Sequence, residues 1–229
     1  MLSKIKGYIA KKFPIIGRPK RLFLAYISKH TKIKKSYSQI GEDEIALKIL
    51  GEGGINNPIF YVDIGANHPS RLSNTYRMYR EGSSGITIEP NEELAQLHRL
   101  IRPRDTQLAI GCGRASQIKK FYYSKVPVLS SFNQCEVEQV WQIGYLPIFT
   151  LDKICKDLEI KSIDFLSIDV EGLDLDVLEG GIEILKNTYL VCIEANTNES
   201  ESKICNFMKQ NNFDFILKNK WNLFFVNKI

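Results

Sequence analysis

From position 59 onward, apolar residues gather into short runs that alternate with segments of helical periodicity. Runs bounded by Gly, Pro, Asn or Asp are typical of buried strands, whereas apolar residues three and four apart share one face of a helix. The expected strands are residues 59–64, 85–89, 106–110, 163–170 and 189–195. The expected helices are residues 73–81, 91–100, 173–186 and 201–210. This alternation predicts an α/β fold whose mostly parallel sheet carries helices on both faces.

Two later segments depart from this rhythm. The first is residues 116–150. Their pattern predicts an edge strand at 118–123, a loop around Ser130, and a stretch from 137 to 150 that is either strand or irregular. An insertion of this kind often forms the substrate side of a site. Residues 213–226 predict a closing hairpin that turns at Asn219 and Lys220.

Charge divides the chain of 229 residues into a basic arm, residues 1–35, and a domain, residues 36–229. The arm carries +11 and no acidic residue, so a net charge of +5 leaves the domain at −6. Leu2, Ile5 and Ile9 recur at helical spacing among the lysines. Two interpretations stay open: a helical arm packed on the domain with its lysines in solvent, or peripheral contact with an anionic membrane. Nucleic acid is not an expected partner, because no motif for it is present and the domain is acidic.

The remaining composition favours a cytoplasmic protein, with the inner face of the membrane as the one alternative location. No apolar run reaches the length of a membrane span, and the basic N-terminus lacks the apolar core of a secretory signal. The five cysteines are odd in number and form no C-x-x-C pair. A zinc site and a disulfide framework are therefore not expected.

Acidic residues stand at the carboxyl ends of three expected strands, where open parallel sheets bind their ligands. Asp63 is followed by the turn Gly65-Ala66-Asn67-His68, Glu89 by Pro90, and Asp169 by Glu171 two residues later. A carboxylate at the second strand end suits the two hydroxyls of a ribose, and the separation of Asp63 and Glu89 fits one strand–helix–strand step. The pattern predicts a nucleoside-containing ligand.

The first turn discriminates among nucleoside ligands. It has a single glycine, Gly65, instead of the glycine-rich turn that approaches a dinucleotide pyrophosphate, and Asp63 suits an ammonium group better than a phosphate. Adenosine joined to an amino acid fits better than NAD. A nicotinamide-dependent oxidoreductase and a non-catalytic nucleoside-binding protein stay open as alternatives. Each acid also has a structural interpretation, as a turn cap, a helix cap or the partner of a nearby cation, and His68 has one as a turn residue.

At these residues the chain resembles the FkbM family of methyltransferases, which use S-adenosylmethionine. The resemblance covers roughly residues 36–195. The segments that carry it are Ser38-Gln39-Ile40-Gly41-Glu42-Asp43, Val62-Asp63-Ile64-Gly65-Ala66-Asn67, Ser73-Asn74-Thr75-Tyr76, Gly85-Ile86-Thr87-Ile88-Glu89-Pro90-Asn91, Thr150-Leu151-Asp152, residues 163–172 and residues 176–181.

The resemblance implies a Rossmann-like methyltransferase fold, with a mostly parallel seven-stranded sheet and an antiparallel last strand. It implies O-methylation of a small-molecule or glycan acceptor, such as a sugar, a glycan building block or a secondary metabolite. The residues that would contact the cofactor are Asp63, Gly65, Ala66 and Asn67 at the methionine part, Glu89 with Pro90 at the ribose, Ala109 and Ile110 at the adenine, and Gln39, Glu42 and Thr75 as a cover.

Methyl transfer to a neutral hydroxyl needs a group that removes the proton. Asp169 is the first candidate, because the end of its strand faces the transferred methyl group in this architecture. His68 is the second and Glu171 the third. A divalent metal at Asp169 stays open as an alternative, but no metal is expected, because no cluster of histidines and carboxylates is apparent in the sequence.

Overall fold

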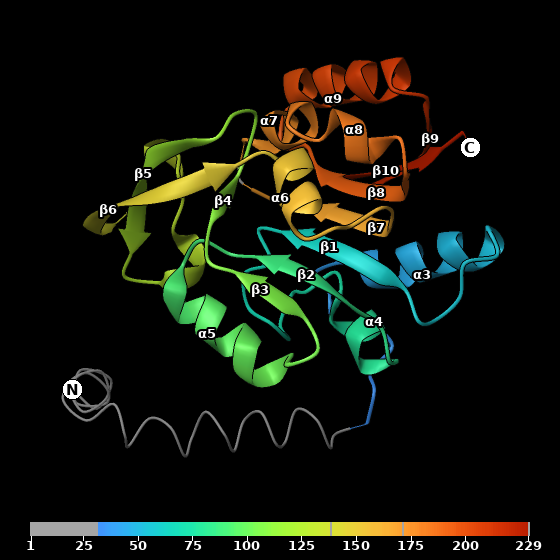
Figure 1. Ribbon diagram of the computed structural model, residues 1–229, viewed down its shortest axis with the longest axis horizontal. Coiled ribbons are helices and arrows are strands. Elements are labelled where there is room, and N and C mark those ends of the chain that lie inside the picture. Colours follow the sequence, from blue (N-terminus) through green and yellow to red (C-terminus); the bar gives the residue numbers. More distant parts are fainter. Residues whose placement is uncertain (1–31, 138, 171, 229) are drawn as a thin grey trace.

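The computed structural model describes residues 32–137, 139–170 and 172–228, and its centre is a seven-stranded sheet (Figure 1). The strands follow the order β3-β2-β1-β7-β8-β10-β9. Their bounds are β1 Phe60–Ile64, β2 Ser84–Ile88, β3 Thr106–Leu108, β7 Ile163–Ile168, β8 Thr188–Glu194, β9 Phe213–Asn219 and β10 Asn222–Asn227. Neighbours from β3 to β8 pair in parallel, whereas β10 runs antiparallel to both β8 and β9. The predicted fold class is confirmed.

Helices cover both faces of this sheet and connect its strands. Those that pack on one face are α3 Glu42–Glu52 and α4 Tyr76–Arg80, and those on the other are α6 Leu151–Asp157, α7 Asp174–Glu179, α8 Ile182–Leu185 and α9 Asn198–Gln210. Helix α5, Glu92–Ile101, connects β2 to β3. Helices on both faces explain why the parallel strands are apolar nearly throughout.

A second, three-stranded sheet lies beyond the carboxyl ends of β1 and β2 (Figure 1). Its strands are β4 Gly111–Cys112, β5 Gln117–Ser124 and β6 Val140–Phe149, in the order β4-β6-β5. Two short 3-10 helices, η1 Pro127–Leu129 and η2 Gln134–Glu136, occupy the connection from β5 to β6. The insertion at 116–150 is thus a sheet with a structured connection, and its later part is a strand.

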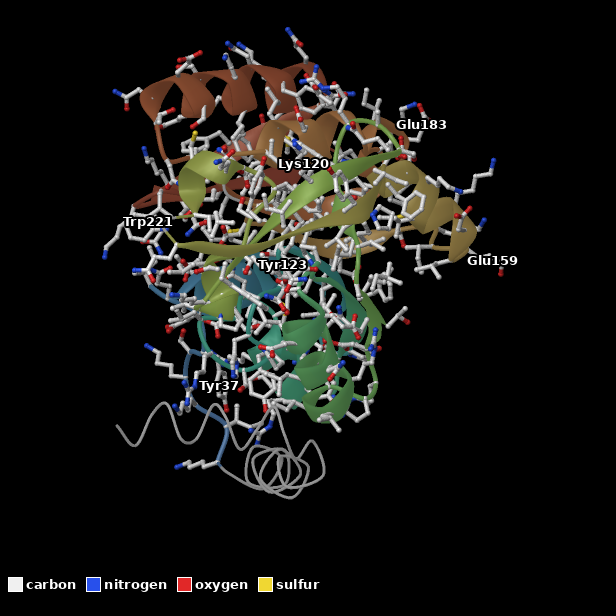
Figure 2. All side chains as sticks on the ribbon, turned by 90° about the vertical axis from the view of Figure 1, so that its left-hand side faces the viewer. Tyr37, Lys120, Tyr123, Glu159, Glu183 and Trp221 are labelled. Atoms are coloured by element: carbon white, nitrogen blue, oxygen red, sulfur yellow. The ribbon has the colours of Figure 1, made fainter. Side chains whose placement is uncertain are left out.

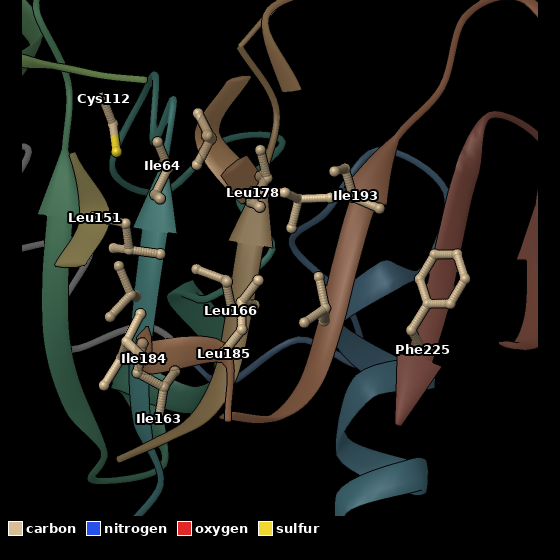
Figure 3. Packing of buried hydrophobic residues seen from close by; sticks show 14 of the residues in the cluster. Ile64, Cys112, Leu151, Ile163, Leu166, Leu178, Ile184, Leu185, Ile193 and Phe225 are labelled. Carbon is tan, nitrogen blue, oxygen red and sulfur yellow. The ribbon is translucent and has the colours of Figure 1, made fainter. Parts of the chain in front are cut away.

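Strand β1 shows how the two-residue period of a strand divides the core. Val62 and Ile64 pack with the helices of the α6–α9 side, while Tyr61 packs with those of the α3–α4 side. Figure 3 shows the first of these clusters, in which Ile64, Leu166 and Ile193 from adjacent strands meet Leu178 of α7. Asp63 alternates with Val62 and Ile64, so its side chain belongs to the face of Tyr61.

Several predicted boundaries are corrected by tertiary contacts. The single helix expected at 173–186 is two helices, α7 and α8, separated at Gly180 and Gly181. A Cβ on Gly180 would lie 2.2 Å from the main-chain oxygen of Gly113. The chain at Gly180 therefore packs too closely against the chain at Gly113 for a residue larger than glycine. Strand β3 ends at Leu108 instead of residue 110, and α4 is shorter than the expected 73–81. Helices α3 and α6 were not expected from the sequence pattern.

Other predictions concern the two ends of the described chain. The closing hairpin is confirmed as β9 and β10, which turn at Lys220. Helix α9 begins three residues before the predicted Glu201, because Thr197 and Ser200 form a capping box at its start. The predicted helical spacing of Leu2, Ile5 and Ile9 lies outside the described residues. Within the described part, no helix has the length and apolar character needed to cross a bilayer.

Candidate active site

A cavity opens at the carboxyl ends of β1, β2 and β7, between the main sheet and the smaller one. Six of the residues predicted for the site line it: Gly65, Asn67, Glu89, Pro90, Ile110 and Asp169. Other lining residues were not singled out in the sequence: Ile64, Ile88, Leu94, Gly111, Cys112, Phe121, Pro127, Val128, Ser130, Ser131, Phe132, Val170 and Leu173. The walls therefore combine a few polar groups at strand ends with an apolar surface supplied largely by the insertion.

Gly65 forms the tight turn after β1. Its φ of 77° lies in the left-handed region that favours glycine, and a Cβ there would lie 1.8 Å from the main-chain oxygen of Asp169. The amide of Asp169 in turn donates to the carbonyl of Ile64 at 3.0 Å. The absence of a side chain at Gly65 thus lets the ends of β1 and β7 approach each other at the cavity.

The carboxylate of Glu89 is held in place at the end of β2. It accepts hydrogen bonds from the backbone amides of Asn67 at 3.0 Å and Asn91 at 2.7 Å. Burial raises the pKa of Glu89 to about 7, and the two amides act in the opposite direction. The carboxylate still has acceptor capacity beyond these two bonds, which is what a pair of ribose hydroxyls would use.

Two asparagines beside Glu89 hold the segment Pro127–Phe132 against the cavity. The side-chain amide of Asn67 donates to the carbonyl of Val128 at 3.2 Å, and that of Asn91 donates to the carbonyl of Pro127 at 3.1 Å. Asn91 also caps α5, because its side-chain oxygen accepts from the amide of Glu93. We call residues 127–132 the strap, since they bridge the β2 end and the smaller sheet.

His98 of α5 binds the turn that follows β1. Its Nε2 donates to the carbonyl of Asn67 at 2.9 Å, and no partner of Nδ1 was found among the described residues. Burial lowers the pKa of His98 to about 3, so the ring is neutral and the proton sits on Nε2. This residue has no sequence signature, because its role depends on contact across the fold.

Asp63 lies next to this turn but not on the cavity wall. Its carboxylate is buried and accepts from the hydroxyl of Thr75 at 2.5 Å, and the same hydroxyl oxygen accepts from Arg102 at 2.9 Å. Arg102 is fully buried and pairs with Asp105 at 2.6 Å. Burial raises the pKa of Asp63, and the charge of Arg102 opposes that effect. In this arrangement Asp63 joins a buried polar network under the β1 turn.

Asp169 stands at the end of β7 with an exposed side chain, on the same cavity as Gly65 and Glu89. Its neighbour Asp174 is buried and accepts from the amides of Val170 and Gly172, both at 3.1 Å, so it fixes the turn that follows β7. Burial raises the pKa of Asp174 to about 7. Glu171 lies outside the described residues.

The other predicted site residues are not among those that line the cavity. Glu42 is buried and accepts from the amide of Ile40 at 2.9 Å and from the side chain of Asn222 at 2.8 Å, which ties α3 to β10. His68 accepts from the amide of Ser70 at 3.2 Å, and burial together with Arg71 lowers its pKa. The three further residues outside the lining are Gln39, which is exposed, Ala66, which is buried, and Ala109, which is partly buried.

The strand order and the cavity together define a class of protein. The sheet is Rossmann-like, with an antiparallel last strand. The cavity at its edge is lined by a glycine in the turn after β1, by a carboxylate after β2 and by apolar side chains. This donor set fits S-adenosylmethionine: Gly65 for close backbone approach, Glu89 for the ribose, and Leu94, Ile110 and Phe121 for an apolar ring. The class is that of the Rossmann-like, S-adenosylmethionine-dependent methyltransferases.

The family model of the FkbM methyltransferase domain matches residues 63–217. The chain therefore belongs to the FkbM methyltransferase family, and its cofactor is S-adenosylmethionine. This assignment excludes the nicotinamide-dependent oxidoreductase considered from the sequence. Among curated proteins, no sequence match was found.

Solved structures with a similar arrangement are distant in sequence. Precorrin-6y C5,15-methyltransferase from Geobacter metallireducens shares 11% identity with a TM-score of 0.45, over 86% of this chain and 92% of that chain. A putative O-methyltransferase from Klebsiella pneumoniae shares 12% identity with a TM-score of 0.45, over 98% and 96%. A putative RNA methyltransferase from Pyrococcus horikoshii shares 13% identity with a TM-score of 0.45, over 90% and 98%.

Proposed function

We propose that this protein transfers a methyl group to a hydroxyl of a sugar, a glycan building block or a similar small metabolite. The observation that supports it is the position of Asp169, which lines the same cavity as Gly65 and Glu89. A hydroxyl acceptor loses its proton at or after methyl transfer, so it needs a base beside the reacting oxygen. An exposed carboxylate at the end of β7 is suited to that role.

S-adenosylmethionine supplies a methyl group that its sulfonium has already activated. The residues of this chain then have three tasks: binding, alignment and removal of the proton. Glu89 holds the nucleoside through the carboxylate positions that the Asn67 and Asn91 amides leave open. The strap, with Phe132 at its end, covers the cavity from the side of the smaller sheet and limits the access of water.

His68 and Glu171 remain weaker candidates for the base. His68 receives a hydrogen bond from the Ser70 amide on Nδ1 and does not line the cavity, which fits a turn residue better than a base. Asp63 would act on the ligand through the turn that it supports, because its carboxylate is bound to Thr75. That turn consists of Gly65, Ala66 and Asn67.

The proposal is tested in two stages. Thermal-shift measurements with S-adenosylhomocysteine are expected to stabilise the protein, because a ligand that binds only the folded state raises the melting temperature. A panel of hydroxyl, amine and carboxyl acceptors is then incubated with isotopically labelled S-adenosylmethionine. Label on a hydroxyl acceptor supports the proposal, whereas transfer to amine or carboxyl acceptors alone contradicts it. Binding without transfer to any acceptor would favour a non-catalytic nucleoside-binding protein.

A further inference from the structure

The smaller sheet presents one face to the cavity and the opposite face to solvent. On the inner face, Phe121 of β5 and Ile148 of β6 are buried, and Phe121 lines the cavity. Residues directly opposite each other on antiparallel strands point to the same side. The outward face is therefore formed by three cross-strand pairs: Ile118 with Pro147, Lys120 with Tyr145, and Tyr122 with Ile143.

This outward face is unusually apolar for a solvent-exposed surface. Ile118 is 73% exposed, Tyr145 is 65% exposed and Ile143 is 52% exposed. Figure 2 turns the side of the molecule that carries β5 and β6 toward the viewer, with Lys120 of β5 labelled. Scattered single apolar residues on a surface are ordinary, but neighbouring ones on one sheet face mark an interaction site.

The charged residues of the strands β5 and β6 are basic, and the connection between the two strands carries charges of both signs. Strand β5 carries Lys119 and Lys120, β6 carries no charged residue, and Lys120 is the charged member of the three outward pairs. The connection between the strands carries Lys125, Glu136 and Glu138. The three outward pairs combine lysine, tyrosine and isoleucine and contain no acid. This combination matches an anionic bilayer, where aliphatic groups enter the acyl boundary, tyrosine lies at the headgroups and lysine meets the anionic lipids. The basic residues 1–35 of the same chain carry +11, which adds to the same attraction.

Other occupants fit the face less well. A second copy docked by two-fold symmetry would bring Lys120 of both copies together, and the three outward pairs contain no acid to compensate. A nucleic acid would be read by a denser set of cations, with fewer aliphatic side chains between them. We propose that the outward face of the β5–β6 sheet docks on an anionic lipid bilayer.

Hydrogen exchange on the full-length chain tests this face separately from the basic arm. Vesicles of phosphatidylcholine and phosphatidylglycerol in equal parts are expected to slow exchange in β5 and β6, whereas phosphatidylcholine alone leaves it unchanged. Slowed exchange confined to residues 1–35 would show that the arm alone binds, and would overturn the proposal. Slowed exchange in β5 and β6 with added RNA, or at high protein concentration without lipid, would assign the face to those partners instead.

Matched variants give the second measurement. The double variant Ile118→Ser with Tyr145→Ser is expected to lower vesicle affinity by about fivefold or more, because two exposed apolar contacts are lost. The control Ile182→Ser with Ile216→Ser removes residues that are 42% and 45% exposed elsewhere, and is expected to bind like wild type. Unchanged melting temperatures show that both variants fold. Equal vesicle affinity of the two variants would overturn the proposal.

Discussion

Gly65 meets two constraints at the scale of a single residue. Its positive φ is strained for any residue with a Cβ, and the main-chain oxygen of Asp169 occupies the place where that Cβ would lie. Gly54 shares the first constraint only, with a φ of 80° and no atom within 4 Å of its Cβ position. Substitutions at Gly54 and Gly65 can therefore distinguish the cost of backbone strain from the cost of close packing.

Gly54→Ala is expected to lower the free energy of unfolding by about 1 kcal/mol through backbone strain alone. Gly65→Ala is expected to cost roughly 2 kcal/mol more, because the ends of β1 and β7 must move apart. Urea unfolding of both variants measures the difference. Losses of equal size would show that the contact with Asp169 does not constrain the turn.

Glu89 links pH to binding. Its pKa of about 7 lies above the usual value of 4.5, so the carboxylate gains charge through the neutral range. The ionised form accepts hydroxyl donors better, and affinity for S-adenosylhomocysteine should rise between pH 6 and 8, by at most about tenfold per pH unit. Titration calorimetry of wild type and Glu89→Gln checks this. A variant that binds as tightly as wild type, with the same pH dependence, would remove Glu89 from the site.

The same shift has a consequence for stability. Folding raises the pKa of Glu89, so the folded protein holds the proton more tightly than the unfolded chain does. This contribution is fully present below pH 4.5 and is lost as the pH rises through about 7. Asp174 has a similarly raised pKa and acts in the same direction. The comparison of urea unfolding with Glu89→Gln, which should lose less stability over that range, isolates Glu89.

Asp169→Asn tests the proposed base. The amide keeps the size of the side chain and the close approach of the main chain to Gly65, so cofactor affinity should remain near that of wild type. Turnover should fall by about 10²–10⁴-fold, since the proton acceptor is gone. Turnover is measured with the acceptor identified in the isotope experiment. Unaltered turnover would assign the proton to another group.

At the scale of elements, the strap depends on helix α5 through Asn91. One side chain both caps the helix, by accepting from the Glu93 amide, and holds the strap, by donating to the Pro127 carbonyl. The Asn67 side chain makes the matching bond to Val128. The β1 turn, the start of α5 and the connection after β5 therefore meet around Glu89.

Asn91→Ser separates the two roles of Asn91. Serine retains an oxygen that caps α5 but cannot reach the Pro127 carbonyl, whereas Asn91→Ala loses both functions. Faster hydrogen exchange in residues 127–132 and weaker S-adenosylhomocysteine binding are expected for both variants. Only Asn91→Ala should lose a further 1 kcal/mol or so of stability from the cap. Wild-type exchange of the strap in Asn91→Ser would show that this bond does not hold it.

At the scale of the whole molecule, charge is divided between a basic arm at +11 and a domain at −6. Deletion of residues 1–35 is expected to reduce co-sedimentation with anionic vesicles, because long-range attraction to the bilayer scales with the number of basic residues near it. The reduction should be largest at low salt, where screening is weakest. An intact protein that ignores anionic vesicles would contradict both the arm and the sheet face as membrane contacts.

The sequence by itself determined the α/β class, the positions of most strands along the chain and the strand-end residues Gly65, Glu89 and Asp169. These depend on local periodicity and on the rule that parallel strands end at one edge, both of which can be read along the chain. It also contained the reason why Asp63 does not line the cavity, since the two-residue period places its side chain on the face of Tyr61. Helix α3, by contrast, lacks a strong periodic signal and was missed.

Only the tertiary structure decided what closes the cavity. Phe121, Val128 and Phe132 reach it because β5 and β6 fold back beyond the main sheet, and no short-range pattern specifies that return. The buried hydrogen bond from Arg102 to Thr75, and the contact of His98 with the Asn67 carbonyl, likewise join residues far apart in the chain. Such contacts follow from the packing of completed elements, whereas the elements themselves follow from their own residues.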